Sequence, residues 1–204
     1  MTDPVIHIVD DEAPVRNSLA FLLMTAGFAV RAHESGPAFL DAVGDPAAIC
    51  LVTDLRMPEM NGVELLEAIS SRGWIIPAVV ITGHGDVPMA VAAMKAGASD
   101  FIEKPFADEV LIEAIRRACE RVQPRAEAGP ASDEVRARLA QLTAREHEIL
   151  TGIVAGLPNK TIAYDLEISP RTVEVHRASI MNKMQAKSLP DLVRMTLLVD
   201  AARN

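Results

Sequence analysis

The chain has 204 residues, a formal net charge of −8 and only 3% aromatic residues. The length is more than one small α/β domain needs, and the net acidity excludes a protein that binds nucleic acid indiscriminately. No charged-then-apolar leader opens the chain, and the longest apolar stretch, 74–81, is too short to span a bilayer. We therefore expect a cytoplasmic protein with no membrane partner.

Five β-favouring runs alternate with five segments of helical periodicity in the first part of the chain. The runs are 5–9, 29–33, 48–53, 78–81 and 101–102, and the helical segments begin near residues 15, 39, 63, 87 and 110. Near-continuous apolar runs indicate strands covered on both faces. The alternation predicts right-handed βαβ units in a three-layer α/β domain with a parallel five-stranded sheet.

Polar residues follow four of these runs: Asp10 with Asp11, then Asp54, Thr82 and Lys104. Ligands of an open parallel sheet bind at the carboxyl ends of the strands, so these groups should converge on one site. Three carboxylates about 4 Å apart would repel by roughly 4 kcal/mol per pair at an effective dielectric constant near 20, and Mg²⁺ would relieve that repulsion. Asp54 is then a candidate nucleophile toward phosphorus, with Lys104 and Thr82 holding phosphoryl oxygens.

Each of these residues also has an ordinary structural interpretation. Asp10 or Asp11 could cap the helix that opens near Pro14, Thr82 could be a turn residue, and Lys104 could be a solvated lysine before a proline. The two cysteines, Cys50 and Cys119, are far apart in the sequence and are expected to be separate core residues rather than a disulfide or a metal site.

Charge and composition change near residue 123. There are 9 Lys and Arg against 18 Asp and Glu before residue 124, and 11 against 10 after it. The segment 123–132 has two prolines and no apolar anchor, which is typical of a linker. We predict a first domain over 1–122, a linker over 123–134 and a second domain over 135–204.

The second domain carries the pattern of a helix-turn-helix. Thr143 and Glu146 form a capping-box pattern before a first helix, Asn159 is expected to cap a short second helix, and Ser169 with Pro170 opens a longer third one. The stretch 169–187 has four basic residues against one acidic residue. Two helices joined by a three-residue turn, the second basic, predict binding in the major groove of double-stranded DNA.

Residues 1–122 resemble the receiver domains of bacterial two-component signalling. The resemblance is carried by Asp10-Asp11, the run 54–62 around Asp54, Thr82-Gly83 and Lys104-Pro105-Phe106. It implies a flavodoxin-like, doubly wound fold with strand order 2-1-3-4-5. It also implies that Asp11, Asp54 and the carbonyl of Arg56 ligate Mg²⁺ with help from Asp10, and that Thr82 and Phe101 switch conformation on phosphorylation. Phe101 departs from the commoner tyrosine and could instead be a core residue.

The second domain resembles the LuxR-type output domain of the NarL/FixJ class. The matching motifs are Leu142-Thr143-Ala144-Arg145-Glu146, Asn159 to Ala163, and Thr172-Val173-Glu174-Val175-His176. The expected DNA-binding residues are Lys160, Thr161, Arg171, Thr172, Glu174, Val175, His176, Arg177, Ala178 and Lys183. His176 could instead be a buried, hydrogen-bonded imidazole.

Together the resemblances imply a response regulator that a sensor histidine kinase phosphorylates on Asp54, and that then dimerises, binds promoter DNA and activates transcription with RNA polymerase. The stretches 83–90 and 98–106 are most similar to the nitrogen-fixation regulators of this class, which would imply a haem-based oxygen sensor as the kinase. One alternative is a phosphohydrolase with an aspartyl nucleophile. Those enzymes carry a second Asp two residues after the first, where this chain has Arg56. Another is a receiver that acts only through protein contacts.

Overall fold

A computed structural model of the chain describes residues 4–43, 46, 49–83, 87–121 and 128–201. The chain divides into two compact units, residues 1–85 with 96–125 and residues 86–95 with 126–204. The border at 125 lies inside the predicted linker. The short helix α4 (Val87–Lys95) groups with the second unit, whereas the sequence analysis had placed it in the first domain.

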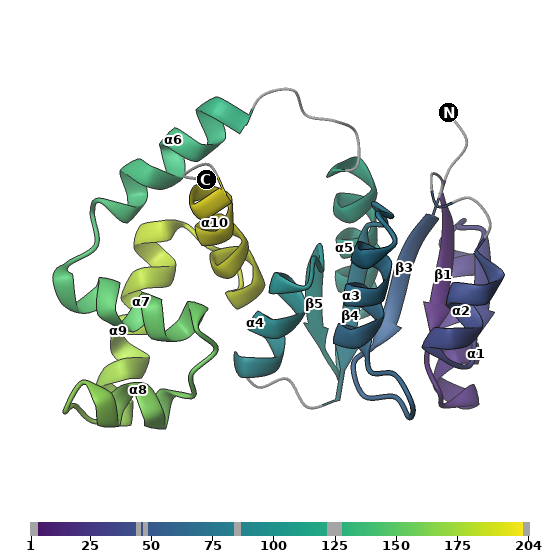
Figure 1. Cartoon of the computed structure of the whole chain (residues 1–204), viewed down its shortest axis with the longest axis horizontal. Helices are drawn as coiled ribbons and strands as arrows, with labels where there is room; N and C mark the ends of the chain where they lie inside the picture. The colour runs from purple at the N-terminus through teal and green to yellow at the C-terminus, as the bar shows by residue number, and fades with distance from the viewer. Residues whose placement is uncertain (1–3, 44–45, 47–48, 84–86, 122–127, 202–204) are drawn as a thin grey trace. The chain divides into compact units, whose positions relative to one another are not determined.

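The first unit contains the predicted parallel sheet (Figure 1). Its strands are β1 (Val5–Val9), β2 (Val30–His33), β3 (Ile49–Asp54), β4 (Ala78–Thr82) and β5 (Asp100–Glu103). Their order is β2-β1-β3-β4-β5 and every pairing is parallel, which confirms the predicted topology. The carboxyl ends of β1, β3, β4 and β5 therefore lie at one edge, where the polar residues are.

Helices cover both faces of this sheet. Helices α1 (Ala13–Thr25) and α5 (Asp108–Arg121) share a buried core with strand residues such as Ile8, Val52 and Ile81. Helix α2 (Gly36–Ala42) lies on the other face, where it contacts α3 (Gly62–Ser71). Successive strand residues face opposite sides, so each buried strand contributes to both cores.

Two histidines belong to the core on the α2 face. The His33 Nε2 and His7 Nδ1 atoms are 2.9 Å apart, and both rings meet the edge of Phe39. Burial, with the nearby charges of His33 and Arg31, lowers the pKa of His7 from 6.5 to about 4. Burial and Arg31 lower the pKa of His33 as well. The pair is therefore held neutral at pH 7.

The second unit is built from helices around its own core. The helices that form this core are α6 (Ala128–Leu139), α7 (Ala144–Val154), α8 (Asn159–Asp165), α9 (Pro170–Met184) and α10 (Leu189–Ala201). Val173, Ile180 and Met184 of α9 are fully buried, and their spacing places them on one face of the helix. Helix α6 occupies part of the predicted linker, because Val135 gives it an apolar contact with this core. Helix α10 was not predicted from the sequence.

One predicted cap of this unit is wrong. The N-cap of α8 is Pro158, and Asn159 is the first helical residue. The Asn159 Oδ1 atom instead accepts a hydrogen bond of 2.7 Å from Arg177 Nη1. The capping box of Thr143 with Glu146 and the cap of α9 by Ser169 are confirmed.

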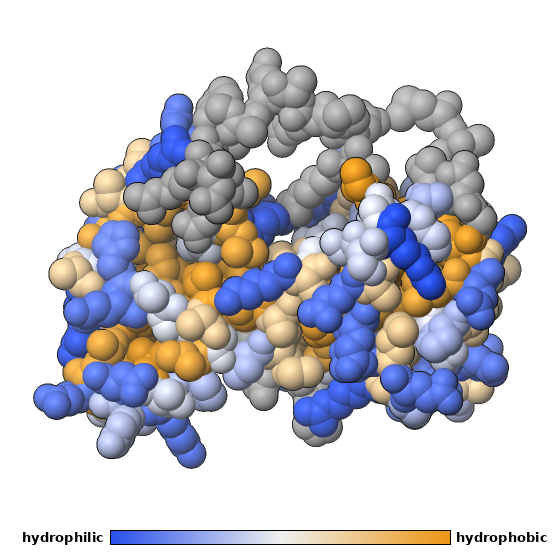
Figure 2. Space-filling view, viewed as in Figure 1, coloured by the Kyte–Doolittle hydropathy of each residue, from blue (hydrophilic) through white to orange (hydrophobic). Residues whose placement is uncertain are grey.

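Hydrophobic residues also reach the surface of the second unit, as Figure 2 shows over its helices. Tyr164 on α8 is 85% exposed, Val175 on α9 is 64% exposed, and Leu198 on α10 is 50% exposed. Scattered exposed apolar residues are normal, but Tyr164 and Val175 both lie on the helix-turn-helix. No helix in the described part of the chain is long and apolar enough to cross a membrane.

Candidate functional sites

Three charged side chains meet at the carboxyl edge of the sheet. The Lys104 Nζ atom, just after β5, is 2.7 Å from Asp54 Oδ1 at the end of β3 and 3.5 Å from Asp10 Oδ2 just after β1. The other oxygen of Asp54 accepts a hydrogen bond of 2.7 Å from the backbone N–H of Arg56. The structure thus brings together three of the residues that the sequence predicted for this site.

Asp10 is held in place by the backbone of the loop that follows it. Its side chain is almost fully buried, and Oδ1 accepts a hydrogen bond of 2.8 Å from the N–H of Glu12. Arg16 donates to the Asp10 carbonyl at 2.6 Å. Asp11 is exposed, and the N-cap of α1 is Glu12, so neither aspartate caps this helix as the structural alternative supposed.

The loop after Asp54 is packed tightly against the strand end. A Cβ atom on Gly62 would lie 2.6 Å from the Asp54 carbonyl oxygen, so this position requires glycine. The N–H of Gly62 donates to Leu55 O at 2.9 Å, and Asn61 caps α3 in a capping box with Glu64. These contacts fix the backbone conformation next to Asp54 and so hold its carboxylate in position.

The charges in this crevice do not balance. Burial is the main cause that raises the pKa of Asp10, with a further contribution from the charge of Asp54, and the N–H of Glu12 and Lys104 only partly oppose it. Burial also lowers the pKa of Lys104, but the hydrogen bond and charge of Asp54 outweigh it, so the net shift is upward. Two carboxylates face one ammonium group, and one further cation would be favoured here.

The donor atoms fit a hard divalent cation. Asp10 and Asp54 offer carboxylate oxygens within one crevice, and the Arg56 carbonyl lies two residues beyond Asp54. Mg²⁺ in proteins typically takes one or two carboxylates and fills its remaining positions with water and phosphate. In the described residues no three His, Cys, Asp or Glu side chains already form a metal-binding cluster, and Asp11 points to solvent in this structure.

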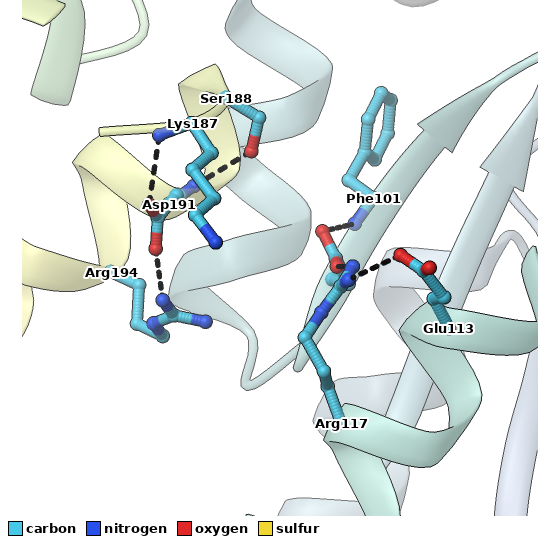
Figure 3. Close-up of polar contacts among 8 residues, drawn as sticks. Phe101, Glu113, Arg117, Lys187, Ser188, Asp191 and Arg194 are labelled. Carbon is cyan, nitrogen blue, oxygen red and sulfur yellow. Dashed lines mark hydrogen bonds and ion pairs between the residues drawn. The ribbon is translucent and has the colours of Figure 1, made fainter. Parts of the chain in front are cut away.

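The predicted switch residues lie on neighbouring strands. Thr82 is fully buried and is the last residue of β4, so it is a strand residue rather than the turn residue of the structural alternative. Its carbonyl accepts a 2.7 Å hydrogen bond from the N–H of Lys104. Phe101 lies on β5 and is half-buried. Figure 3 shows its ring pointing away from the side chain of Arg117. Arg117 forms an ion pair of 2.9 Å with Asp100.

Helices α8 and α9 form the predicted helix-turn-helix. Ser169 Oγ caps α9 by accepting a hydrogen bond of 3.0 Å from the N–H of Thr172. The predicted DNA-binding residues divide by exposure, and His176 is half-buried rather than fully buried. Exposed are Lys160, Thr161, Arg171, Glu174, Val175 and Ala178, and half-buried are Thr172, His176, Arg177 and Lys183. Tyr164, which the sequence analysis missed, adds an exposed hydroxyl to this surface.

Lys183, one of the expected DNA-binding residues, contacts Glu146 of α7. Its Nζ atom donates a hydrogen bond of 2.7 Å to Glu146 Oε2, and Ser179 donates one of 2.7 Å to Oε1. The hydrogen bond from Lys183, with those from the Thr143 backbone and from Ser179, lowers the pKa of Glu146 from 4.5 to about 2. Lys183 therefore joins α9 to the start of α7. Its positive charge is paired with Glu146 and is not directed to the solvent.

The start of α10 is also held by polar contacts, as the Asp191 side of Figure 3 shows. The Asp191 carboxylate accepts from the N–H of Lys187 at 3.0 Å and from Arg194, while Ser188 Oγ accepts from the N–H of Asp191 at 3.3 Å. Lys187, counted above in the basic stretch, thus contributes its backbone to a helix start and keeps its side chain exposed.

Comparison with known proteins identifies both units. Residues 6–116 match the family model of the response regulator receiver domain, and residues 140–196 match that of bacterial regulatory proteins of the luxR family. The chain is 63% identical to the transcriptional regulatory protein FixJ of Rhizobium meliloti over 97% of each chain, and 53% identical to FixJ of Azorhizobium caulinodans over 97% of this chain and 93% of that one. A crystal structure of full-length FixJ from B. japonicum matches with a TM-score of 0.56, at 44% identity, over 98% of this chain and 99% of that one.

These matches favour the regulator over the phosphohydrolase, since the relatives are transcriptional regulators with a DNA-binding domain. They cover nearly the whole chain, including both the charged crevice and the helix-turn-helix. The chain therefore belongs to the FixJ-like response regulators of the NarL/FixJ class, the two-component transcriptional regulators that join a receiver to a LuxR-type DNA-binding domain.

Proposed function

We propose that phosphorylation of Asp54 by a sensor histidine kinase converts this protein into a dimer that binds promoter DNA and activates transcription. The observation that carries the proposal is the excess of carboxylate in a crevice that also presents Lys104, 2.7 Å from Asp54. A carboxylate held in this way is suited to attack phosphorus, and a lysine is suited to hold the transferred oxygens.

The residues around Asp54 divide the work of the transfer. The Arg56 N–H holds Oδ2, so the carboxylate cannot rotate freely while an oxygen attacks phosphorus. Lys104 stays charged at neutral pH because Asp54 helps to keep its pKa raised, and it can move from the carboxylate to the phosphoryl oxygens. The Thr82 hydroxyl, at the end of the neighbouring strand, would turn toward the same oxygens, and Phe101 would move with it.

Mg²⁺ would be held by Asp10, Asp54 and the carbonyl of Arg56. Asp11, which is exposed, would turn toward the ion. When bound, the ion would neutralise charge on the transferring phosphoryl group. The added phosphate carries roughly −1.5 to −2 charges, and its contacts with Lys104 and Thr82 would supply differential stabilisation of an active conformation.

The second unit would read DNA as a dimer. Two copies of α9 would enter the major groove at half-sites about one turn of DNA apart. We propose base contacts from Glu174, Val175, Arg177 and Ala178. Phosphate contacts would come from Lys160, Thr161, Arg171, Thr172 and His176, with Tyr164 added. Lys183 would support α9 through Glu146 and contact DNA only by leaving that ion pair.

The wider setting follows from the resemblance to FixJ. The kinase would be a haem-based oxygen sensor, the targets would be nitrogen-fixation promoters, and RNA polymerase would be the partner at those promoters. The protein would act in the cytoplasm.

Replacing Asp54 tests the phosphorylation step. We expect Asp54→Asn to take up no phosphoryl group from acetyl phosphate with Mg²⁺, measured by intact mass, and to lose the gain in DNA affinity that phosphorylation gives. Asp41→Asn, which changes an exposed carboxylate on α2, should behave as the unmodified protein does. An Asp54→Asn protein that is still phosphorylated once per chain would refute the assignment.

Replacing Arg177 tests the DNA-reading helix. Loss of a side chain that contacts a base typically costs about 1–3 kcal/mol, so Arg177→Ala should weaken binding of the phosphorylated protein to its promoter roughly 10- to 100-fold. Arg136→Ala removes the same charge from an exposed position on α6 and is the matched control. Unchanged affinity in a folded Arg177→Ala protein would favour a receiver that acts through protein contacts.

A further inference from the structure

The two cysteines of the chain meet inside the first unit, which corrects the expectation that they lie apart. Cys50 lies in β3 and Cys119 lies in the last turns of α5, yet both side chains belong to one core and lie close enough for each thiol to shift the pKa of the other. Cys50 is completely buried in the core that α1 and α5 share with the sheet. Cys119 packs against the same core from the helix and is only partly buried.

The two thiols are chemically unequal. The hydrogen bond from Cys50 lowers the pKa of Cys119, and burial and the charge of Glu120 only partly oppose that shift. The same hydrogen bond, together with burial, raises the pKa of Cys50 well above its usual value. Cys119 therefore ionises first, and the thiolate is the reactive form of a cysteine.

Cys119 is also the thiol that a small reagent can reach. It lines a cavity of about 340 Å³ whose other walls include Gly27 and Phe28 after α1 and Arg116 and Glu120 on α5. Water takes roughly 30 Å³ per molecule in the liquid, so a hydroperoxide fits easily. Arg116 and Glu120 bring opposite charges to the wall of this cavity, and the charge of Glu120 disfavours an anionic sulfur.

We propose that Cys119 and Cys50 are a redox site at which hydrogen peroxide oxidises the pair to an intramolecular disulfide. The Cys119 thiolate attacks one peroxide oxygen, the O–O bond breaks, and the second oxygen leaves as hydroxide and takes up a proton to become water. The sulfenic acid on Cys119 is then attacked by the Cys50 sulfur, which loses its proton as the second water leaves. Two thiols are oxidised by two electrons, and one peroxide is reduced to two waters.

The disulfide would join α5 to β3, the strand that ends at Asp54. A thiol reductant would reverse it by exchange, as is usual for disulfides in proteins of reducing compartments. The site is independent of the phosphoacceptor, because Cys50 lies four residues before Asp54 on the strand and points into the opposite core from Leu51.

Thiol counting on the full chain tests the proposal, since the chain has only two cysteines. Reduced protein is freed of reductant, treated with hydrogen peroxide in native buffer, quenched with catalase, denatured, and alkylated with a maleimide before intact-mass measurement. We expect no alkylated cysteine, a mass about 2 Da below that of the reduced chain, a monomer on a non-reducing gel, and full recovery of both thiols with dithiothreitol.

Two single variants test the order of the steps. In Cys50→Ser the sulfenic acid on Cys119 has no partner and should be trapped by dimedone. In Cys119→Ser the buried Cys50 should remain free for alkylation after the same treatment. Two alkylated thiols in the treated wild-type protein, disulfides only between chains, or a disulfide that forms only in urea would overturn the proposal. Equal oxidation of the two single variants would overturn the assignment of Cys119 as the attacking thiol.

Discussion

Both units contain a mostly buried carboxylate that a lysine contacts at 2.7 Å, Asp54 with Lys104 in one and Glu146 with Lys183 in the other. Their surroundings differ. Glu146 also accepts from Ser179 and from the Thr143 backbone, and these contacts lower its pKa to about 2. In the crevice, Lys104 is shared between two carboxylates, and the pKa of Asp10 is raised.

The difference shows that the distance between the two charged groups of an ion pair does not tell whether the pair is structural or part of a binding site. Both carboxylate oxygens of Glu146 accept hydrogen bonds from its neighbours. Glu146 therefore stabilises the helix-turn-helix and needs no further ligand. The crevice holds more negative charge than its lysine can neutralise, which destabilises this part of the fold and favours a cation there. Excess charge, rather than a short distance, distinguishes a binding site from a structural contact.

Acidification should affect the first unit before the second. His7 has a pKa of about 4 when folded and about 6.5 when unfolded, so the unfolded state takes up a proton first and the first unit should lose up to about 3 kcal/mol as the pH falls from 6.5 to 4. The raised pKa of Asp10 offsets part of this loss, since the folded state gains that proton first. Glu146 has a lowered pKa, so its contribution should be lost only as the pH falls from about 4.5 toward 2.

Urea unfolding at each pH measures both units in one sample. Trp74 is the only tryptophan and lies in the first unit, so its fluorescence reports that unit, while far-UV circular dichroism reports all helices. His147→Gln, an exposed change on α7, should leave the pH dependence as it is. A fluorescence midpoint that does not change between pH 7 and 4.5 would contradict the neutral histidine pair.

Neutralising Glu146 should destabilise the second unit by about 2 kcal/mol, because Lys183 loses its partner at a mostly buried position. In Glu146→Gln the circular dichroism transition should shift to lower urea concentration, while the Trp74 transition stays in place. Glu148→Gln is the matched control, since this neighbouring glutamate is exposed and pairs with Arg145 at the surface. Equal effects of the two substitutions would show that Glu146 is not structural.

Removing one carboxylate from the crevice should stabilise its unit rather than destabilise it, and the effect on stability should be smaller than that of Glu146→Gln. We expect Asp10→Asn to stabilise the first unit by about 1 kcal/mol, because it removes a buried charge whose pKa is raised, while it slows phosphorylation by acetyl phosphate. Asp11→Asn changes an exposed neighbour and should leave the Trp74 transition unchanged. A loss of stability in Asp10→Asn would mean that Lys104 already balances both carboxylates.

Much of the fold follows from local patterns. The five strands, the cap of α9 by Ser169 and the capping box of α7 agree with the structure, since apolar runs, glycine stops and capping residues act over a few neighbours. The strand order also agrees, but it was expected from the resemblance to receiver domains. The polar strand ends could also be predicted to converge, because a parallel sheet places its carboxyl ends at one edge. The sequence of helix α10 has no pattern as clear as the motifs that precede it, so this helix was not predicted.

By itself, the sequence determined the two-part architecture, the family and the residues that form the charged crevice. Only the tertiary structure decided which distant side chains meet. Lys183 turns inward to Glu146, 37 positions away, Asn159 accepts from Arg177 instead of capping its helix, and Cys119 reaches Cys50. Local preferences carry no information about such pairs, because the packing of whole helices and strands brings them together.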